Sequence, residues 1–253
     1  MSSLPDPQPF EESEPPSPAS PWSIADLAVF AFVFIGIVLL VPVAVVRVWH
    51  AFDPDLQVTD IPPTAQLLMQ ALIDLATLGF IAFLIKVVHG QSFTETIHWR
   101  KDHHFGTAFL ISLGATLAVS VMIISAFFPS GDPPIQKLLS STTAMYVFVV
   151  FGVAVAPLFE EIMFRGFLFK LFGDMWGSAK AVPLTALLFG LLHLLQLWGS
   201  WAGVVLIFGV GYVLSFIRLR SNSVIPSIII HTSYNGMLFG AFALSTLVQK
   251  IAH

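Results

Sequence analysis

The sequence contains no cysteine and few charged residues. The absence of cysteine among its 253 residues excludes disulfide bonds, catalytic thiolates and zinc sites built from cysteine. Charged residues make up only 10% of the chain, whereas a soluble domain usually carries about 25%. Because 56% of the residues are hydrophobic and the mean hydropathy is +0.86, the composition indicates an integral membrane protein.

Several catalytic and binding motifs are also missing. The sequence has no HExxH motif, no Gly-x-Ser-Gly motif of the rhomboid-like kind and no Gly-x-Gly-Asp motif of the presenilin-like kind. It has neither a Walker loop nor a Gly-rich dinucleotide turn after a strand, and it lacks basic patches of the nucleic-acid-binding type. These absences argue against site-2-type proteolysis and against a nucleic-acid partner.

The first 22 residues differ from the rest of the chain. They are rich in Pro, Ser and Glu and contain no basic residue, so they lack the positive region of a signal peptide. This composition predicts a disordered, Pro-rich cytoplasmic tail over residues 1–22, followed by a transmembrane helical domain over residues 23–253.

Hydrophobic runs of about 20 residues, the length that crosses a bilayer as a helix, follow the tail. They predict an all-α, polytopic membrane bundle of seven to eight transmembrane helices with an intramembrane active-site cavity. A helix break is expected over residues 129–134 and a loop over Gly173–Val182, with Pro183 opening the next helix. The expected spans are Ile24–Val46, Gln66–Val88, Phe105–Phe128, Thr143–Phe172, Pro183–Trp198, Trp201–Ile217 and Val224–Val248.

The Lys and Arg residues are distributed unevenly between the two expected membrane faces. One face has only three, whereas the other has eight, which the positive-inside rule assigns to the cytoplasm. The N-terminus is then cytoplasmic, and the expected location is the cell's inner (plasma) membrane. The eight are Lys86, Arg100, Lys101, Arg165, Lys170, Lys180, Arg218 and Arg220.

Few strongly polar side chains fall inside the expected spans. Ionisable groups in a membrane are costly unless they are paired or face a protein interior or wet cavity, so each is a candidate functional residue. Because they come from four different helices, several of them are expected to share one cavity. They are Asp74, Glu160, Glu161, His193, His231 and Asn235.

The spacing of these residues separates their expected roles. Glu161 and Arg165 are four apart with the acid first, the better orientation for an ion pair, which leaves Glu160 free to face the cavity. His231 and Asn235 are also four apart and share one helix face. Asp74 and Gln70 have the same spacing, and an interhelical or cavity-lining role is the simpler interpretation of that pair.

Two hydrolytic chemistries fit this set of side chains. Glu160 and His193 can hold and deprotonate a water molecule, while His231 and Asn235 offer donors to a developing oxyanion. Alternatively, Glu160, His193 and His231 form a set of two histidines and one carboxylate that suits zinc. Outside proteolysis, the same groups suit a proton-coupled transporter or a scaffold that binds a membrane partner, and Glu161 with Arg165 suits a purely structural ion pair.

Three motifs occur in order on hydrophobic segments: Glu160-Glu161-x-x-x-Arg165, Phe189-x-x-x-His193 and His231-x-x-x-Asn235. Together they resemble the CPBP family of CAAX-type and bacteriocin-processing intramembrane endopeptidases, also called Abi proteins. The motif-bearing core covers residues 143–241, and Trp99-Arg100-Lys101 is similar to a further, weaker family feature.

The resemblance implies an intramembrane protease that cuts a membrane-associated peptide or protein substrate, possibly a lipidated one. It implies a site made of Glu160, Glu161, Arg165, His193, His231 and Asn235. In this family pattern the first glutamate and the first histidine activate the water. The family includes descriptions both with and without metal. The shared face of His231 and Asn235 favours a glutamate-type mechanism with no cofactor, and zinc is the alternative.

Overall fold

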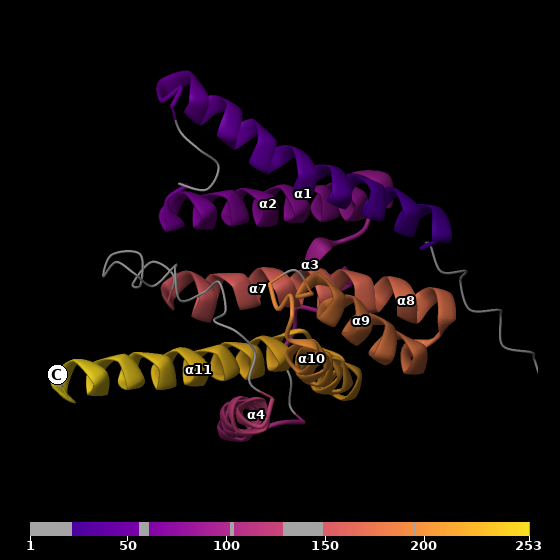
Figure 1. Cartoon of the computed structure of the whole chain (residues 1–253). Helices are drawn as coiled ribbons and strands as arrows, with labels where there is room; N and C mark the ends of the chain where they lie inside the picture. Colours follow the sequence, from indigo (N-terminus) through magenta and orange to yellow (C-terminus); the bar gives the residue numbers. More distant parts are fainter. Residues whose placement is uncertain (1–21, 56–60, 102–103, 129–148, 195, 253) are drawn as a thin grey trace, which may run out of the picture.

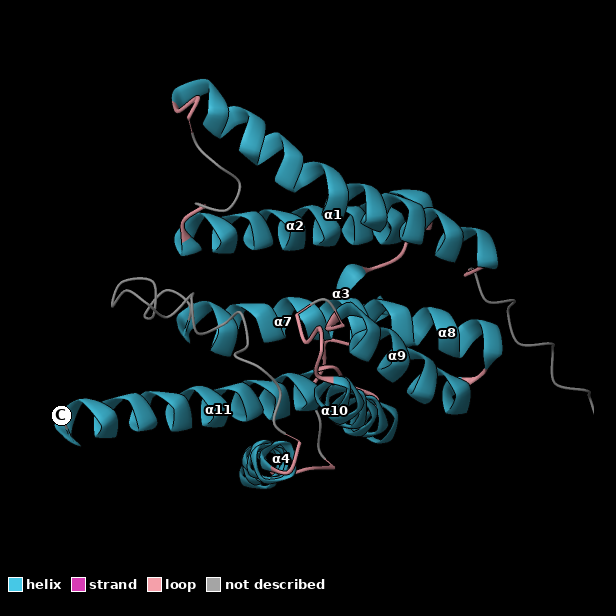
Figure 2. Ribbon diagram, in the orientation of Figure 1, coloured by secondary structure: helices cyan, strands magenta, loops and turns pink. Residues whose placement is uncertain are grey.

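The computed structural model describes residues 22–55, 61–101, 104–128, 149–194 and 196–252. All regular elements within these ranges are helices, as Figure 2 shows, so the all-α prediction is confirmed. Residues 1–21 of the predicted tail and the predicted break at 129–134 lie outside the described residues.

Two long helices form one layer of the molecule, at the top of Figure 1. They are α1 (Ile24–Phe52) and α2 (Pro63–Phe83), and α2 continues into a π-helical segment over Leu84–Val88. Ser23 and Asp26 begin α1 with a capping box, which satisfies backbone N–H groups that the first turn leaves free. The short helix α3 (Phe93–Thr96) leads from this layer to the rest of the bundle.

The middle layer carries the paired glutamates. It contains α7 (Ala156–Glu161), α8 (Phe169–Trp176) and α9 (Ser178–Leu192), which lie together in Figure 1. The predicted loop over Gly173–Val182 is wrong, because helix occupies this range on both sides of Gly177. Gly177 has a φ of +89° and makes the tight turn between the two helices. This single residue replaces the ten-residue loop that was predicted from the sequence.

Two further details of α9 differ from expectation. Pro183 lies inside the helix rather than at its first position, since the helix already begins at Ser178. The helix ends at Leu192, short of the predicted Trp198, and His193 follows as its C-terminal cap. The second motif's histidine therefore lies at a helix end, where its ring is not confined to one helical face.

The third layer contains α4 (Thr107–Ala126), α10 (Trp201–Ser221) and α11 (Ile225–Ala252). In Figure 1, α11 runs across the lower part of the molecule, while α4 and α10 are seen nearly end-on beside it. Helices α4 and α11 approach closely at Gly114, where a Cβ atom would lie 2.4 Å from the carbonyl oxygen of Ile230. Small residues allow such approaches between membrane helices.

Four helices of the described ranges are long and apolar enough to cross a membrane. Their outward surfaces agree with this, since many large apolar side chains on them are exposed, for example Phe32, Leu39 and Phe109. The chain is thus an integral membrane protein with a helical bundle. The four cover Ile24–Phe52, Thr64–Val88, Thr107–Ala126 and Trp201–Ser221, and Ser178–Leu192 is a shorter apolar helix.

Aromatic packing joins the start of α1 to the middle layer. Trp22, the last residue of the predicted tail, is buried and lies 5.4 Å from the ring of Phe167 and 4.3 Å from that of His89, between centroids. His89 also hydrogen-bonds through Nε2 to Asp26 at 2.9 Å. These contacts tie the start of α1 to the middle layer.

Two arginines counted in the charge analysis do not lie at the surface. Arg165 and Arg218 are buried, and Nε of Arg218 donates to the backbone carbonyl of Arg165 at 2.9 Å. They therefore belong to the protein interior, and only the other six residues of that set can contribute to a basic surface.

The turn between α10 and α11 is held by the segment before α4. Arg100 donates to the carbonyl of Asn222 at 2.8 Å, and Ser223 donates to the carbonyl of Arg100 at 2.5 Å. The N–H of Val224 donates to the carbonyl of His98. Burial, followed by the charges of Arg218, Arg100 and Lys170, lowers the pKa of His98 to about 4, so its Nδ1 can accept a hydrogen bond from Arg100. This contact fixes where α11 begins.

We predict that Gly114→Ala destabilises the bundle by about 1–3 kcal/mol, the usual cost of overpacking a tight contact. The added methyl group meets backbone of α11, which cannot rotate away as a side chain would. Thermal unfolding in detergent would measure this change. Gly79→Ala on α2 is the matched control, since nothing lies within 4 Å of its Cβ position. Equal melting temperatures for the two variants would contradict the close approach.

Candidate functional site

The paired glutamates lie between two irregular stretches of helix. A π-helical segment over Phe151–Val155 precedes α7, and a second one over Ile162–Leu168 follows it. Such wide turns are uncommon and often occur at functional sites, because they rotate the following side chains relative to a regular helix. Glu160 and Glu161 are the last two residues of α7, the short α-helical stretch that separates the two π-helical segments.

A cavity of about 1290 Å³ is lined by side chains of α1 and α2 together with side chains of α4, α7, α9, α10 and α11. Glu160 from α7, His193 from the end of α9, and His231 and Asn235 from α11 line it. Asp74 and Gln70 of α2 line it as well. The prediction that several intramembrane polar residues share one cavity is thus confirmed, although Glu161 and Arg165 are not among the lining residues.

Glu161 and Arg165 form a fully buried ion pair behind the cavity wall. Nη1 of Arg165 donates to Oε1 of Glu161 at 2.8 Å, and both side chains are 0% exposed. Nη2 of the arginine donates to the carbonyl of Gly211 on α10 at 2.9 Å. The guanidinium carbon also lies 4.5 Å from the centroid of the Phe189 ring. The pairing predicted from the spacing of the two residues is present.

His231 connects this ion pair to the cavity. Its Nδ1 lies 2.8 Å from Oε1 of Glu161, and its Nε2 lies 3.8 Å from Oε2 of Glu160. A carboxylate that is paired with a buried arginine is ionised and can only accept, so Nδ1 is the donor. In the neutral ring the lone pair is then on Nε2, the nitrogen nearer Glu160.

His193 is oriented by its own helix. Nδ1 donates to the backbone carbonyl of Phe189 at 2.8 Å, and the two rings lie 4.6 Å apart between centroids. Since a carbonyl only accepts, the unprotonated nitrogen of neutral His193 is again Nε2. Both histidines are therefore held in the tautomer that leaves Nε2 as a base or a ligand.

Asn235 has one visible structural task. Its Nδ2 donates at 2.7 Å to the carbonyl of Gly152, within the first π-helical segment. In the π-helical pattern the partner of that carbonyl would be the N–H five residues later, and residue 157 is a proline, which has none. Asn235 replaces the missing backbone donor and ties α11 to the helix that carries Glu160. Its second amide N–H remains for another acceptor.

Sequence analysis missed two buried hydroxyl groups beside the cavity. The side chains of Thr77 and Tyr234 are 4% and 3% exposed, both residues line the cavity, and neither hydroxyl has a hydrogen-bond partner among the described residues. Thr77 follows Gln66, Gln70 and Asp74 at helical spacing on α2, a signal that the sequence does contain.

The possible zinc ligands do not form a ready-made cluster. Within the described residues, no group of three or more His, Asp or Glu side chains is arranged to hold a metal ion. Glu160 and His231 are nonetheless adjacent, and Nε2 of each histidine is the nitrogen that a metal would use. The donor types therefore fit zinc, although the three groups would have to draw together around it.

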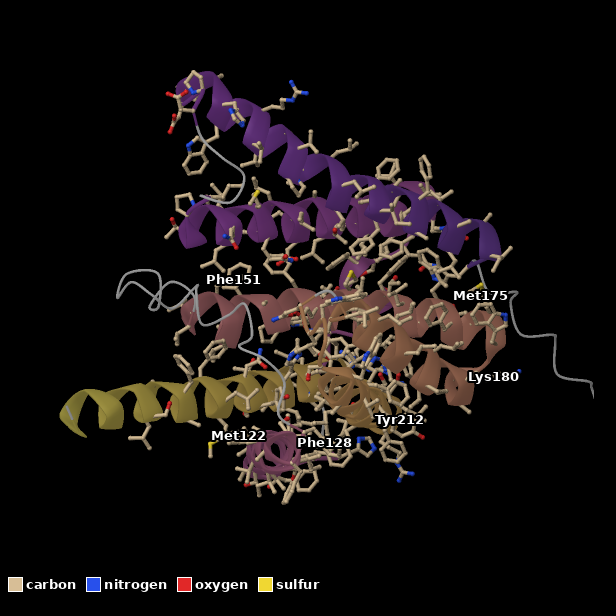
Figure 3. All side chains as sticks on the ribbon, in the orientation of Figure 1. Met122, Phe128, Phe151, Met175, Lys180 and Tyr212 are labelled. Carbon is tan, nitrogen blue, oxygen red and sulfur yellow. The ribbon has the colours of Figure 1, made fainter. Side chains whose placement is uncertain are left out.

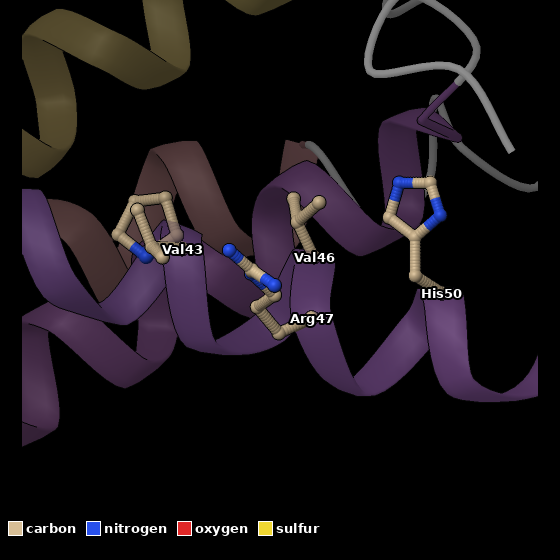
Figure 4. A pocket seen from close by; sticks show the side chains of 5 residues that line it. Val43, Val46, Arg47 and His50 are labelled. Carbon is tan, nitrogen blue, oxygen red and sulfur yellow. The ribbon is translucent and has the colours of Figure 1, made fainter. Parts of the chain in front are cut away.

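Another hollow lies far from these residues. It has a volume of about 560 Å³ and runs along the distal half of α1, as Figure 4 shows. No carboxylate lines it, and it shares no lining residue with the large cavity, so we assign it no part in the site. Its lining residues are Pro42, Val43, Val46, Arg47 and His50.

The buried ion pair generates a stability prediction. Arg165→Met leaves the carboxylate of Glu161 buried without its cation, which typically costs about 3–5 kcal/mol. We expect a large fall in melting temperature in detergent, partly recovered in the double variant Glu161→Gln/Arg165→Met, where no charge remains uncompensated.

The matched control is the Lys170–Asp174 pair of α8, which has the same spacing but is partly exposed. Lys170→Met should cost less than about 1 kcal/mol. If Arg165→Met were no more damaging than Lys170→Met, the central role of the buried pair would be wrong.

Comparison with known proteins adds the family. Residues 142–237 match the family described as type II CAAX prenyl endopeptidase Rce1-like. No curated protein and no solved structure matches the chain. The matched range contains all three motifs and each residue of the candidate site from Glu160 to Asn235. The chain is therefore an integral membrane protein whose residues 142–237 are similar to the Rce1-like, CAAX-type endopeptidase family.

Proposed function

We propose that this protein is an intramembrane endopeptidase that hydrolyses a peptide bond of a membrane-associated peptide or protein. The observation that supports the proposal best is the meeting of Glu160, His193, His231 and Asn235 at one cavity within an apolar bundle. These groups come from three separate segments. Placing polar side chains inside a membrane costs free energy, so their convergence on one cavity points to a function. Apolar side chains, including Phe34, Val38 and Leu67, line the remainder and suit an apolar or lipidated substrate.

In this proposal Glu160 and His193 activate the attacking water. Oε2 of Glu160 is buried and has no hydrogen-bond partner among the described residues, while Nε2 of His193 is its basic nitrogen. A water molecule that donates one hydrogen bond to each of these acceptors keeps a lone pair free to attack the scissile carbonyl carbon. General-base assistance of this kind contributes about 10²–10⁴-fold to a rate.

His231 and Asn235 would stabilise the oxyanion. The second amide N–H of Asn235 is available, because only one is used by Gly152. Nδ1 of His231 is 2.8 Å from Glu161, and its Nε2 can donate to the oxyanion when both ring nitrogens carry a proton. The buried ion pair thus acts on the reaction through His231 rather than by touching the substrate.

The proposed reaction needs no covalent intermediate. The water oxygen bonds to the scissile carbonyl carbon, and its proton passes to Glu160 or His193. The tetrahedral intermediate collapses as the C–N bond breaks, and the same proton passes to the leaving amine. The products are a carboxylic acid and an amine, which become a carboxylate and an ammonium group once the acid's proton passes to the amine, and water is the only co-reactant.

Zinc held by Glu160, His193 and His231 is the second candidate, and the orientation of both Nε2 atoms is the observation that favours it. Bound zinc would supply a Lewis acid and lower the pKa of its water. In that case His231 would bind zinc through Nε2, and Glu161 would orient the ring by accepting the hydrogen bond from its Nδ1.

We predict that Glu160→Gln and His193→Ala each lower peptide hydrolysis by at least about 10²-fold, the low end expected for a positioned acid or base. The assay is cleavage of a membrane peptide library by the purified protein, read by mass spectrometry. Melting temperatures should change little, because both side chains are half-exposed to the cavity.

Asp174→Asn on α8 serves as the control, since it also removes a carboxylate but lies outside the cavity. Losses of activity that track losses of stability would favour a purely structural cluster. An unchanged cellular phenotype with Glu160→Gln would favour a scaffold, and Glu160-dependent proton flux in liposomes would favour a transporter.

We predict that treatment with a chelator leaves hydrolysis intact. The reason is that the donor pair on α11 can stabilise an oxyanion without a metal. The measurement is metal content by elemental analysis together with activity before and after stripping. Stoichiometric zinc, and activity restored only when zinc is returned, would instead assign Glu160, His193 and His231 as ligands.

A further inference from the structure

A polar stripe on α2 forms the cavity wall opposite the proposed catalytic residues. Its members follow one another at offsets of four, four and three, which places them on one helix face. All four line the same cavity as Glu160 and His231, and α2 packs against α1 elsewhere on its surface. The stripe consists of Gln66, Gln70, Asp74 and Thr77.

Asp74 is the only ionisable member of the stripe. It lies near the middle of the apolar span Thr64–Val88, where a charge costs about 2.5–3.5 kcal/mol if nothing compensates it. Its hydrogen-bond partner among the described residues is neutral, since Nε2 of Gln70 donates to Oδ1 of Asp74 at 2.8 Å. The hydrogen bond orients the carboxyl group, but it supplies no opposite charge.

The charges around Asp74 favour a cation. The described residues that line the cavity include two carboxylic acids, Asp74 and Glu160, and no Lys or Arg. Both carboxyl groups line the same cavity, where the surrounding apolar side chains screen their charges only weakly. A cationic group between the two walls would relieve both the desolvation and the repulsion.

Thr77 adds an independent sign that a ligand belongs on this face. Its side chain is 4% exposed and lines the cavity, and its hydroxyl has no partner among the described residues. A buried hydroxyl without a partner is costly, whereas an extended polypeptide offers backbone N–H and C=O groups that would satisfy it. Gln66 and Gln70 can likewise both donate and accept.

We propose that the α2 stripe is a substrate-recognition wall in which Asp74 binds a lysine or arginine side chain of the polypeptide to be cut. This rests on the proposed function, and it adds a preference in the substrate for a basic residue close to the scissile bond. Gln70 positions Asp74, and the neighbouring amide and hydroxyl groups bind the extended backbone. An acidic substrate residue at the same place is rejected by two carboxylates.

Binding to His193→Ala protein tests this proposal, because both cavity carboxylates are kept while hydrolysis is prevented. The probes are fluorescent apolar peptides with a single lysine moved along the chain, and matched peptides with norleucine or glutamate at the same place. We expect the best lysine peptide to bind about tenfold to hundredfold more tightly than its norleucine match, the range of one charge-assisted hydrogen bond.

Asp74→Asn in the same background keeps the shape and the contact with Gln70 but removes the charge. It should abolish the lysine preference, whereas the control Asp174→Asn should leave it unchanged. Equal binding of lysine and norleucine peptides, or a preference that survives Asp74→Asn, would overturn the proposal.

A second measurement does not depend on the folding of a variant. Dicyclohexylcarbodiimide should couple the lysine amine of the bound peptide to the Asp74 carboxyl, and peptide mapping would locate the amide bond. Coupling only at acids outside the cavity would also overturn the proposal.

Cleavage assays of the wild-type protein separate this inference from the proposed function. If lysine peptides bind through Asp74 but no peptide is ever cut, the recognition wall stands and the endopeptidase proposal fails. If peptides are cut at equal kcat/KM with and without lysine, the endopeptidase proposal stands and the recognition wall fails.

Discussion

The buried pair of Glu161 and Arg165 organises the centre of this protein. One carboxylate oxygen accepts from both Arg165 on its own helix and His231 on α11, and the same arginine donates to the backbone of α10. Burying two charges is costly unless hydrogen bonds compensate them, so these contacts couple the positions of the helices that they join. Figure 3 shows the side chains that fill the space between the three layers.

The irregular backbone of the bundle also lies around the paired glutamates. The two π-helical segments flank the glutamates, and Pro157 removes the N–H that would bind the carbonyl of Gly152. Asn235 supplies that donor from α11. The helix of the first motif therefore relies on the third motif for a backbone hydrogen bond, so the two motifs are coupled structurally as well as through the shared cavity.

The cavity has two chemically different walls. One wall combines bases and donors that are held by buried contacts behind them, as His231 is held by Glu161. The opposite wall, on α2, carries a polar stripe whose only ionisable group is held by one neutral hydrogen bond. A rigid wall suits proposed chemistry, which needs fixed distances, and the α2 wall suits recognition, because its groups can adapt to a bound chain.

Much of this arrangement could be predicted from the sequence because membranes impose simple rules. Composition alone required apolar helices, and a spacing of four was enough to pair Glu161 with Arg165 and to put His231 on one face with Asn235. The loop predicted over Gly173–Val182 was wrong, since one glycine with positive φ can replace a long connection and no composition rule measures φ.

The sequence by itself determined the membrane-embedded helical class, the resemblance to a protease family and the short list of polar residues inside the spans. Only the tertiary structure decided which of them share a cavity, that Arg165 and Arg218 are buried, and that Asp74 and Glu160 line one cavity whose described lining contains no Lys or Arg. The physical reason is that spacing fixes contacts within one helix, whereas contacts between helices depend on packing that no single helix encodes.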